Sequence, residues 1–136
     1  MENKYKILIF VLSIFIVGCT NLTTNEITNY EPKSTGSLGA GDVLIELTPL
    51  NIKDGKLNVK IDMNTHNIDL AQFDLKQITT LEYNGKSINP IDVPILRGHH
   101  SSGILIFNVD NNIKDFTIKI KNIPPTGDRI FEWKVR

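Results

Sequence analysis

The sequence predicts an all-β domain, an antiparallel β-sandwich of about seven strands. From Asp42 onward, apolar and polar residues alternate with a period of two through a series of short segments. Turn-forming residues separate these segments about every ten positions. No stretch after Cys19 shows a convincing helical stripe, although residues 70–78 are compatible with a helical turn or two.

The expected strands are residues 43–48, 57–64, 79–83, 86–93, 104–109, 116–121 and 130–135. Asp54-Gly55 forms the turn between the first two. Asn84-Gly85 joins the third strand to the fourth, because both central residues of a type I′ turn take positive φ. Such a series is typical of an immunoglobulin-like or cupredoxin-like sandwich, and a small barrel is the alternative fold.

The first 18 residues have the organisation of a secretory signal peptide. Lys4 and Lys6 precede an uncharged apolar run of about 11 residues, too short for the roughly 20 residues of a membrane-spanning helix. The run ends in Ile16-Val17-Gly18-Cys19, which resembles the lipobox of prokaryotic lipoproteins. The resemblance implies that Cys19 becomes the first residue of the mature chain and carries the lipid that anchors it to a membrane.

Residues 19–41 are expected to form the lipidated cysteine and a flexible tether. The segment is rich in Thr, Asn, Ser and Gly and has no hydrophobic period. A flexible coil of about 22 residues has a root-mean-square reach of roughly 25 Å. The expected organisation is therefore a signal peptide at 1–18, the lipidated Cys19 and tether at 19–41, and a β-sandwich at 42–136 on the extracytoplasmic face of a cell membrane.

Charge and cysteine content exclude several classes of function. The chain has 15 Lys and Arg residues and 15 Asp and Glu residues, so its formal net charge is zero. Nucleic-acid binding is not expected, because it is driven largely by a basic surface. The single cysteine cannot form a disulfide within the chain. The sequence lacks the motifs of serine hydrolases, zinc metalloproteases and phosphate-binding loops, so we do not expect an enzyme.

All three histidines lie in two irregular segments at the ends of expected strands. His66 is in the first segment, and His99 and His100 are in the second. If the two segments lie at the same end of the sandwich, the imidazoles could converge on a metal ion, with Met63 as a soft ligand. Imidazole with thioether suits copper, and imidazole with carboxylate suits zinc. A blue-copper centre is excluded, because it needs a thiolate and Cys19 is assigned to the lipid.

The alternative is that the histidines are structural. Loop histidines often hydrogen-bond to backbone carbonyls, and the adjacent His99 and His100 would point to opposite sides if their segment is extended. The domain would then be a structural or protein-interaction module, and an apolar patch left exposed on its surface would favour this alternative.

Several short motifs within residues 43–133 resemble those of a family of small, uncharacterised prokaryotic exported proteins. They include Asn64-Thr65-His66, Gly98-His99-His100 and Arg129-Ile130-Phe131-Glu132-Trp133. The resemblance implies that the domain boundaries and the histidine-bearing loops are defining features of the family. It implies no activity.

Together these patterns predict a membrane-anchored extracytoplasmic lipoprotein that acts as a non-catalytic binding module. The expected ligand is a metal ion, copper or zinc, held by His66, His99 and His100 with Met63. The alternative partner is another protein of the cell envelope.

Overall fold

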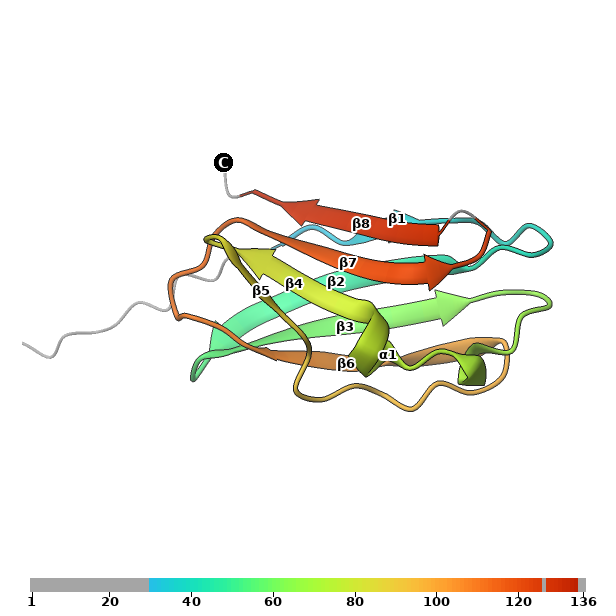
Figure 1. The fold of residues 1–136 in the computed structure, drawn as a ribbon, viewed down its shortest axis with the longest axis horizontal. Helices are drawn as coiled ribbons and strands as arrows, with labels where there is room; N and C mark the ends of the chain where they lie inside the picture. The colour runs from blue at the N-terminus through green and yellow to red at the C-terminus, as the bar shows by residue number, and fades with distance from the viewer. Residues whose placement is uncertain (1–29, 126, 135–136) are drawn as a thin grey trace, which may run out of the picture.

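The computed structural model describes residues 30–125 and 127–134, which form two antiparallel sheets (Figure 1). One sheet has the strand order β1-β2-β3-β6, and the other has the order β5-β4-β7-β8. The predicted antiparallel β-sandwich is confirmed, and the two sheets do not close into the alternative barrel. The predicted signal peptide, Cys19 and the first part of the predicted tether lie outside the described residues.

The strands are β1 (Lys33–Thr35), β2 (Leu44–Lys53), β3 (Lys56–Asn64), β4 (Thr79–Tyr83), β5 (Lys86–Ile88), β6 (His100–Asn108), β7 (Phe116–Ile123) and β8 (Gly127–Trp133). A 3-10 turn, η1 (Leu70–Gln72), and a helical turn, α1 (Leu75–Ile78), occupy the segment in which the sequence predicts helical turns. Asp69 and Asp74 precede these turns, and each side chain accepts a hydrogen bond from a backbone N–H two residues later. The two aspartates therefore determine where the helical turns begin.

The hydrophobic core comes directly from the period-two alternation. In β3, Leu57, Val59, Ile61 and Met63 are fully buried, whereas the residues between them are half-buried or exposed. Successive side chains of a strand point to opposite faces of the sheet, so only one set reaches the space between the two sheets. Trp133 at the end of β8 is also buried in this space.

The predicted tether overlaps the folded domain. The sequence predicts a tether through residue 41, but the structure places β1 within that segment and pairs Ser34 with Glu46 of β2. The sequence pattern does not reveal β1, because this strand has only three residues, all of them polar and most of them exposed. It adds an eighth strand to the seven that the alternation predicts.

Several predicted strands have different bounds in the structure, and two of the differences have a clear cause. The strand predicted at 86–93 ends at Ile88, since Pro90 and Pro94 interrupt the segment that follows. The strand predicted at 104–109 begins earlier, at His100, because its polar first residues still pair with β3.

Residues 89–97, here called the edge strap, follow β5 and run along the outer edge of β6 (Figure 1). The N–H of Ile91 donates to the carbonyl O of Ile106 at 2.8 Å. Pro94 occupies the place of a side chain at Gly103, since a Cβ on this glycine would lie 2.3 Å from Cβ of Pro94. The strap covers the edge of β6, which would otherwise be free to pair with another chain.

Residues 30–35, here called the N-terminal arm, pack against inward-facing side chains of β7 and β8. The indole N–H of Trp133 donates to the carbonyl O of Glu31 at 2.8 Å. The Trp133 ring stacks on Phe116 with 5.1 Å between the ring centroids, and Tyr30 packs edge-on against Phe116 at the same distance. The arm is therefore part of the sandwich and joins it at the end where β7 begins and β8 ends.

We expect Trp133→Phe to lower the free energy of unfolding by about 1 kcal/mol, because the ring still packs but the bond to Glu31 is lost. Urea denaturation measures this loss. The control is the same substitution in a chain that begins at Gly36 and has no arm. If the loss is as large in that chain, the hydrogen bond to the arm is not its cause.

Candidate functional site

The two histidine-bearing segments, residues 64–70 and 97–100, lie side by side at one end of the sandwich, here called the histidine end (Figure 1). The N–H of Thr65 donates to the carbonyl O of His99 at 2.9 Å, and the N–H of Leu70 donates to that of Gly98 at 2.8 Å. The metal hypothesis requires both segments at one end, and the geometry meets this requirement.

Two of the three imidazoles hydrogen-bond to the neighbouring segment. Nδ1 of His99 lies 2.9 Å from the carbonyl O of Ile68, and it must carry the proton because a carbonyl can only accept. Nδ1 of His100 lies 2.8 Å from Oδ1 of Asn64. The two adjacent rings therefore have different partners. The third imidazole, that of His66, is exposed.

The predicted ligands have different surroundings in the structure. Met63, near the end of β3, is fully buried and belongs to the hydrophobic core. Among residues 30–125 and 127–134, no three His, Cys, Asp or Glu side chains are grouped so that they could hold a metal ion. The histidine end instead shows two rings that each tie one loop to the other.

A serine hydroxyl closes the turn that leads into β6. Oγ of Ser101 donates to the carbonyl O of Arg97 and accepts from the backbone N–H of Arg97, both at 2.8 Å. Gly98 within the turn has a φ of 58°, in the left-handed region that glycine adopts without strain. The closed turn determines how His99 and His100 approach the neighbouring segment.

An ion pair connects β8 to the loop between β1 and β2. Nη2 of Arg129 donates to Oδ1 of Asp42 and to the carbonyl O of Pro124, both at 2.6 Å. The side chains of Arg129 and Asp42 are 8% and 16% exposed, so the pair is largely removed from water. Loss of one partner would leave the other charge poorly solvated and unpaired.

The backbone around Asp42 also holds the first histidine-bearing segment. Oγ1 of Thr65 donates to the carbonyl O of Asp42 at 2.8 Å. The N–H of Gly41 donates to Oδ1 of Asn67 at 3.0 Å. The ion pair and the loop that carries His66 therefore belong to one connected set of contacts.

Asp42 is kept in its charged form by its surroundings. Burial alone would raise the pKa of this carboxyl group. Hydrogen bonds from Ser37 and from the N–H of Val43, together with the Arg129 guanidinium, outweigh burial and lower the pKa below its ordinary value of 3.8.

The sequence contains only a partial signal for this ion pair. Arg129 lies two residues before Phe131, and strand alternation places both on the same inward face. An arginine at an inward position needs a buried partner. Its partner could not be identified, because Asp42 is 87 residues away and pairing between such distant residues depends on the fold.

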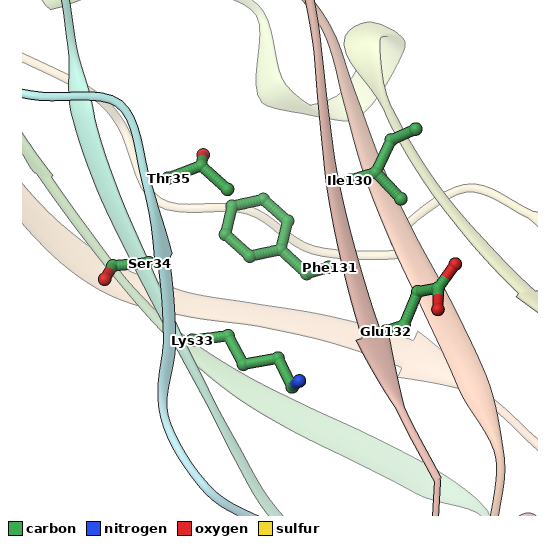
Figure 2. Close-up of a pocket in the computed structure, with 6 residues that line it drawn as sticks. All are labelled: Lys33, Ser34, Thr35, Ile130, Phe131 and Glu132. Atoms are coloured by element: carbon green, nitrogen blue, oxygen red, sulfur yellow. The ribbon is translucent and has the colours of Figure 1, made fainter.

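A cavity of about 480 Å³ lies between β1 and β8 (Figure 2). Its walls are Lys33, Ser34, Thr35, Ile130, Phe131 and Glu132. Figure 2 shows the Phe131 ring between the two strands and directed toward β1, and this ring is 1% exposed. Two of the wall residues, Lys33 and Glu132, carry charges of opposite sign.

None of the family models, curated proteins and solved structures that were compared with the chain matches it. Membership of the exported family that its motifs resemble therefore stays a prediction. None of the helical turns in the described residues has the length and apolarity needed to cross a membrane.

We expect Arg129→Met to lower the free energy of unfolding by about 3 kcal/mol at neutral pH, because it leaves the Asp42 carboxylate without its cation. Asp42→Asn is expected to cost about 1 to 2 kcal/mol, since the amide oxygen can still accept from Arg129. The loss in the double variant should be smaller than the sum of the two single losses. Denaturation of all four chains measures the coupling, and additive losses would contradict it.

The lowered pKa of Asp42 predicts a loss of stability in acid. A carboxyl group whose pKa is lower in the folded chain stabilises the fold above its unfolded pKa, 3.8, and this contribution disappears as the pH falls through the folded pKa. The stability advantage of the wild type over Asp42→Asn should be constant above about pH 5 and shrink below about pH 4. Urea denaturation across this range tests the expectation, and a difference independent of pH would contradict it.

Proposed function

We propose that the protein is a lipid-anchored, extracytoplasmic lipoprotein whose β-sandwich is a non-catalytic module that binds another protein of the cell envelope. The anchor is supported by Ile16-Val17-Gly18-Cys19, which directly follows the apolar run of the signal peptide. The binding role is supported by an apolar surface beside β6.

The observation that carries the proposal is a set of exposed isoleucines on the edge strap and on β6, here called the isoleucine edge: Ile91, Ile95 and Ile104. Their exposed fractions are 43%, 79% and 38%. Covering apolar surface is favourable by about 25 cal/mol per Å². Single exposed apolar residues are common, but several on neighbouring segments favour an interaction surface.

Backbone contacts keep the isoleucine edge in a fixed register. Ile91 is hydrogen-bonded to Ile106 of β6, and Pro94 packs on Gly103, the residue before Ile104. The edge strap then ends at the turn that the Ser101 hydroxyl closes. A surface already held in its binding conformation loses little conformational entropy when a partner docks.

The histidines have a structural role in this proposal. His99 ties the turn after the edge strap to Ile68 in the segment after β3, and His100 ties the start of β6 to Asn64 at the end of β3. They stabilise the backbone from which Ile95 extends, and they need not touch the partner.

Photo-crosslinking in intact cells tests the proposal, with the reactive residue placed at position 91 or 95 and, as a control, at position 130. Ile130 is 50% exposed but lies on β8 of the other sheet. We expect one discrete adduct from positions 91 and 95 and none from position 130. The purified partner should bind at least tenfold more weakly to Ile95→Lys and equally well to Ile130→Lys. The same adducts from all three positions would contradict a specific surface.

The second candidate is a module that binds copper or zinc through His66, His99 and His100. One observation favours it: the two segments lie side by side, and the bond from Nδ1 of His99 to a carbonyl leaves Nε2 for a ligand. Metal-binding histidines commonly use their second nitrogen in this way.

Calorimetric titration of the chain from Thr20 onward with Cu(I), Cu(II) and Zn(II) tests this candidate. Metal binding predicts a one-to-one complex that is lost in His66→Ala and in the double variant His99→Ala/His100→Ala. Absence of binding, with lower thermal stability of the double variant, would leave only the structural role.

A further inference from the structure

The described chain begins at one end of the sandwich, opposite the histidine end. Tyr30 packs on Phe116 at the start of β7, and its hydroxyl donates to the carbonyl O of Ile113. Glu31 is bonded to Trp133 at the end of β8. β1 then runs toward the start of β2, where Thr35 pairs with Ile45. Tyr30, the first described residue, therefore lies at this end of the sandwich, here called the arm end.

The distance that the preceding segment can span is limited. Cys19 and Tyr30 are about 11 residues apart, which span no more than about 38 Å at full extension. A coil of this length has a root-mean-square reach of only about 18 Å. The nine residues of β3 alone extend over about 30 Å. A lipid on Cys19 could therefore lie beyond the histidine end only if the segment were almost fully stretched along the whole sandwich.

From this geometry we propose that the sandwich stands on the membrane with the arm end facing the lipid headgroups and the histidine end pointing away. The proposal rests on the proposed lipid anchor at Cys19. The surface that meets the headgroups consists of the turns around Asp54-Gly55 and Asn84-Gly85 and the loop from β6 to β7. The isoleucine edge then runs along the side of the standing domain, where a neighbouring envelope protein can reach it.

The chemistry of the arm end suits contact with a headgroup layer without insertion into it. Lys53, Asp54, Lys86, Asp110 and Lys114 are exposed there. Nζ of Lys86 lies 2.7 Å from Oδ2 of Asp110, which joins the turn between β4 and β5 to the loop after β6. The large apolar side chains that are exposed in the described residues all lie outside these turns. The lipid anchor, and not burial of apolar side chains, would hold this surface at the membrane.

Energy transfer to the membrane surface tests the orientation. The full-length lipidated chain is bound to phosphatidylcholine vesicles that carry an acceptor dye on a fraction of their headgroups. A donor dye is attached to a single introduced thiol in Asn111→Cys at the arm end, in Leu38→Cys at the histidine end, or in Ile130→Cys on the side. The sulfur of Cys19 is occupied by the lipid, so the introduced cysteine is the only free thiol. The transfer rate should be highest at position 111, intermediate at 130 and several-fold lower at 38.

The controls separate failure of the orientation from failure of the anchor. The chain that begins at Thr20, which lacks both the apolar run and the lipidated cysteine, should stay in the supernatant when the vesicles are sedimented, while the lipidated chain sediments with them. Equal sedimentation of both chains would overturn the anchor and, with it, the orientation. Anchor-dependent sedimentation with equal transfer from positions 38 and 111, or with the highest transfer from 130 or 38, would overturn the orientation alone.

Discussion

The inward side chains of β8 bind the N-terminal part of the domain across the open side between the two sheets, and much of the remaining structure depends on these contacts. Arg129 bonds to Asp42 near the histidine end, and Trp133 bonds to Glu31 at the arm end. Phe131 fills the space between them. Together they position β1 beside β8, while the edge strap covers β6 on the opposite side. The strap thereby protects the edge of β6 from pairing with another chain.

The strands in which apolar and polar residues alternate could be predicted from the sequence, because neighbouring residues alone show which face of the strand is buried. The fully buried residues of β3 are the alternate ones that the pattern selects. β1 could not be predicted in this way. Its three polar residues carry no pattern, and the arm is held by Trp133, which is 102 residues from Glu31. Contacts between such distant residues appear only when the sheets are assembled.

In the candidate site, too, the positions of the histidines follow from the local sequence, whereas their bonding partners depend on the assembled fold. Strand ends could be located from the sequence, and the two histidine-bearing segments do lie at the same end. The partners of the rings could not be predicted, because His100 meets Asn64 only through the register of β3 and β6. The inward position that made Met63 attractive as a ligand is also what buries it in the core. The polar contacts of His99 and His100 therefore favour a role in holding loops.

The N-terminal arm must be a folded part of the sandwich for the proposed orientation to hold, because the arm determines where the chain leaves the domain toward its proposed anchor. Native-state hydrogen exchange of the β1 amides tests this directly. We expect the amides of β1 that pair with β2 to exchange far more slowly than those of an unstructured peptide. Exchange of all the Lys33–Thr35 amides at the unstructured rate would contradict it.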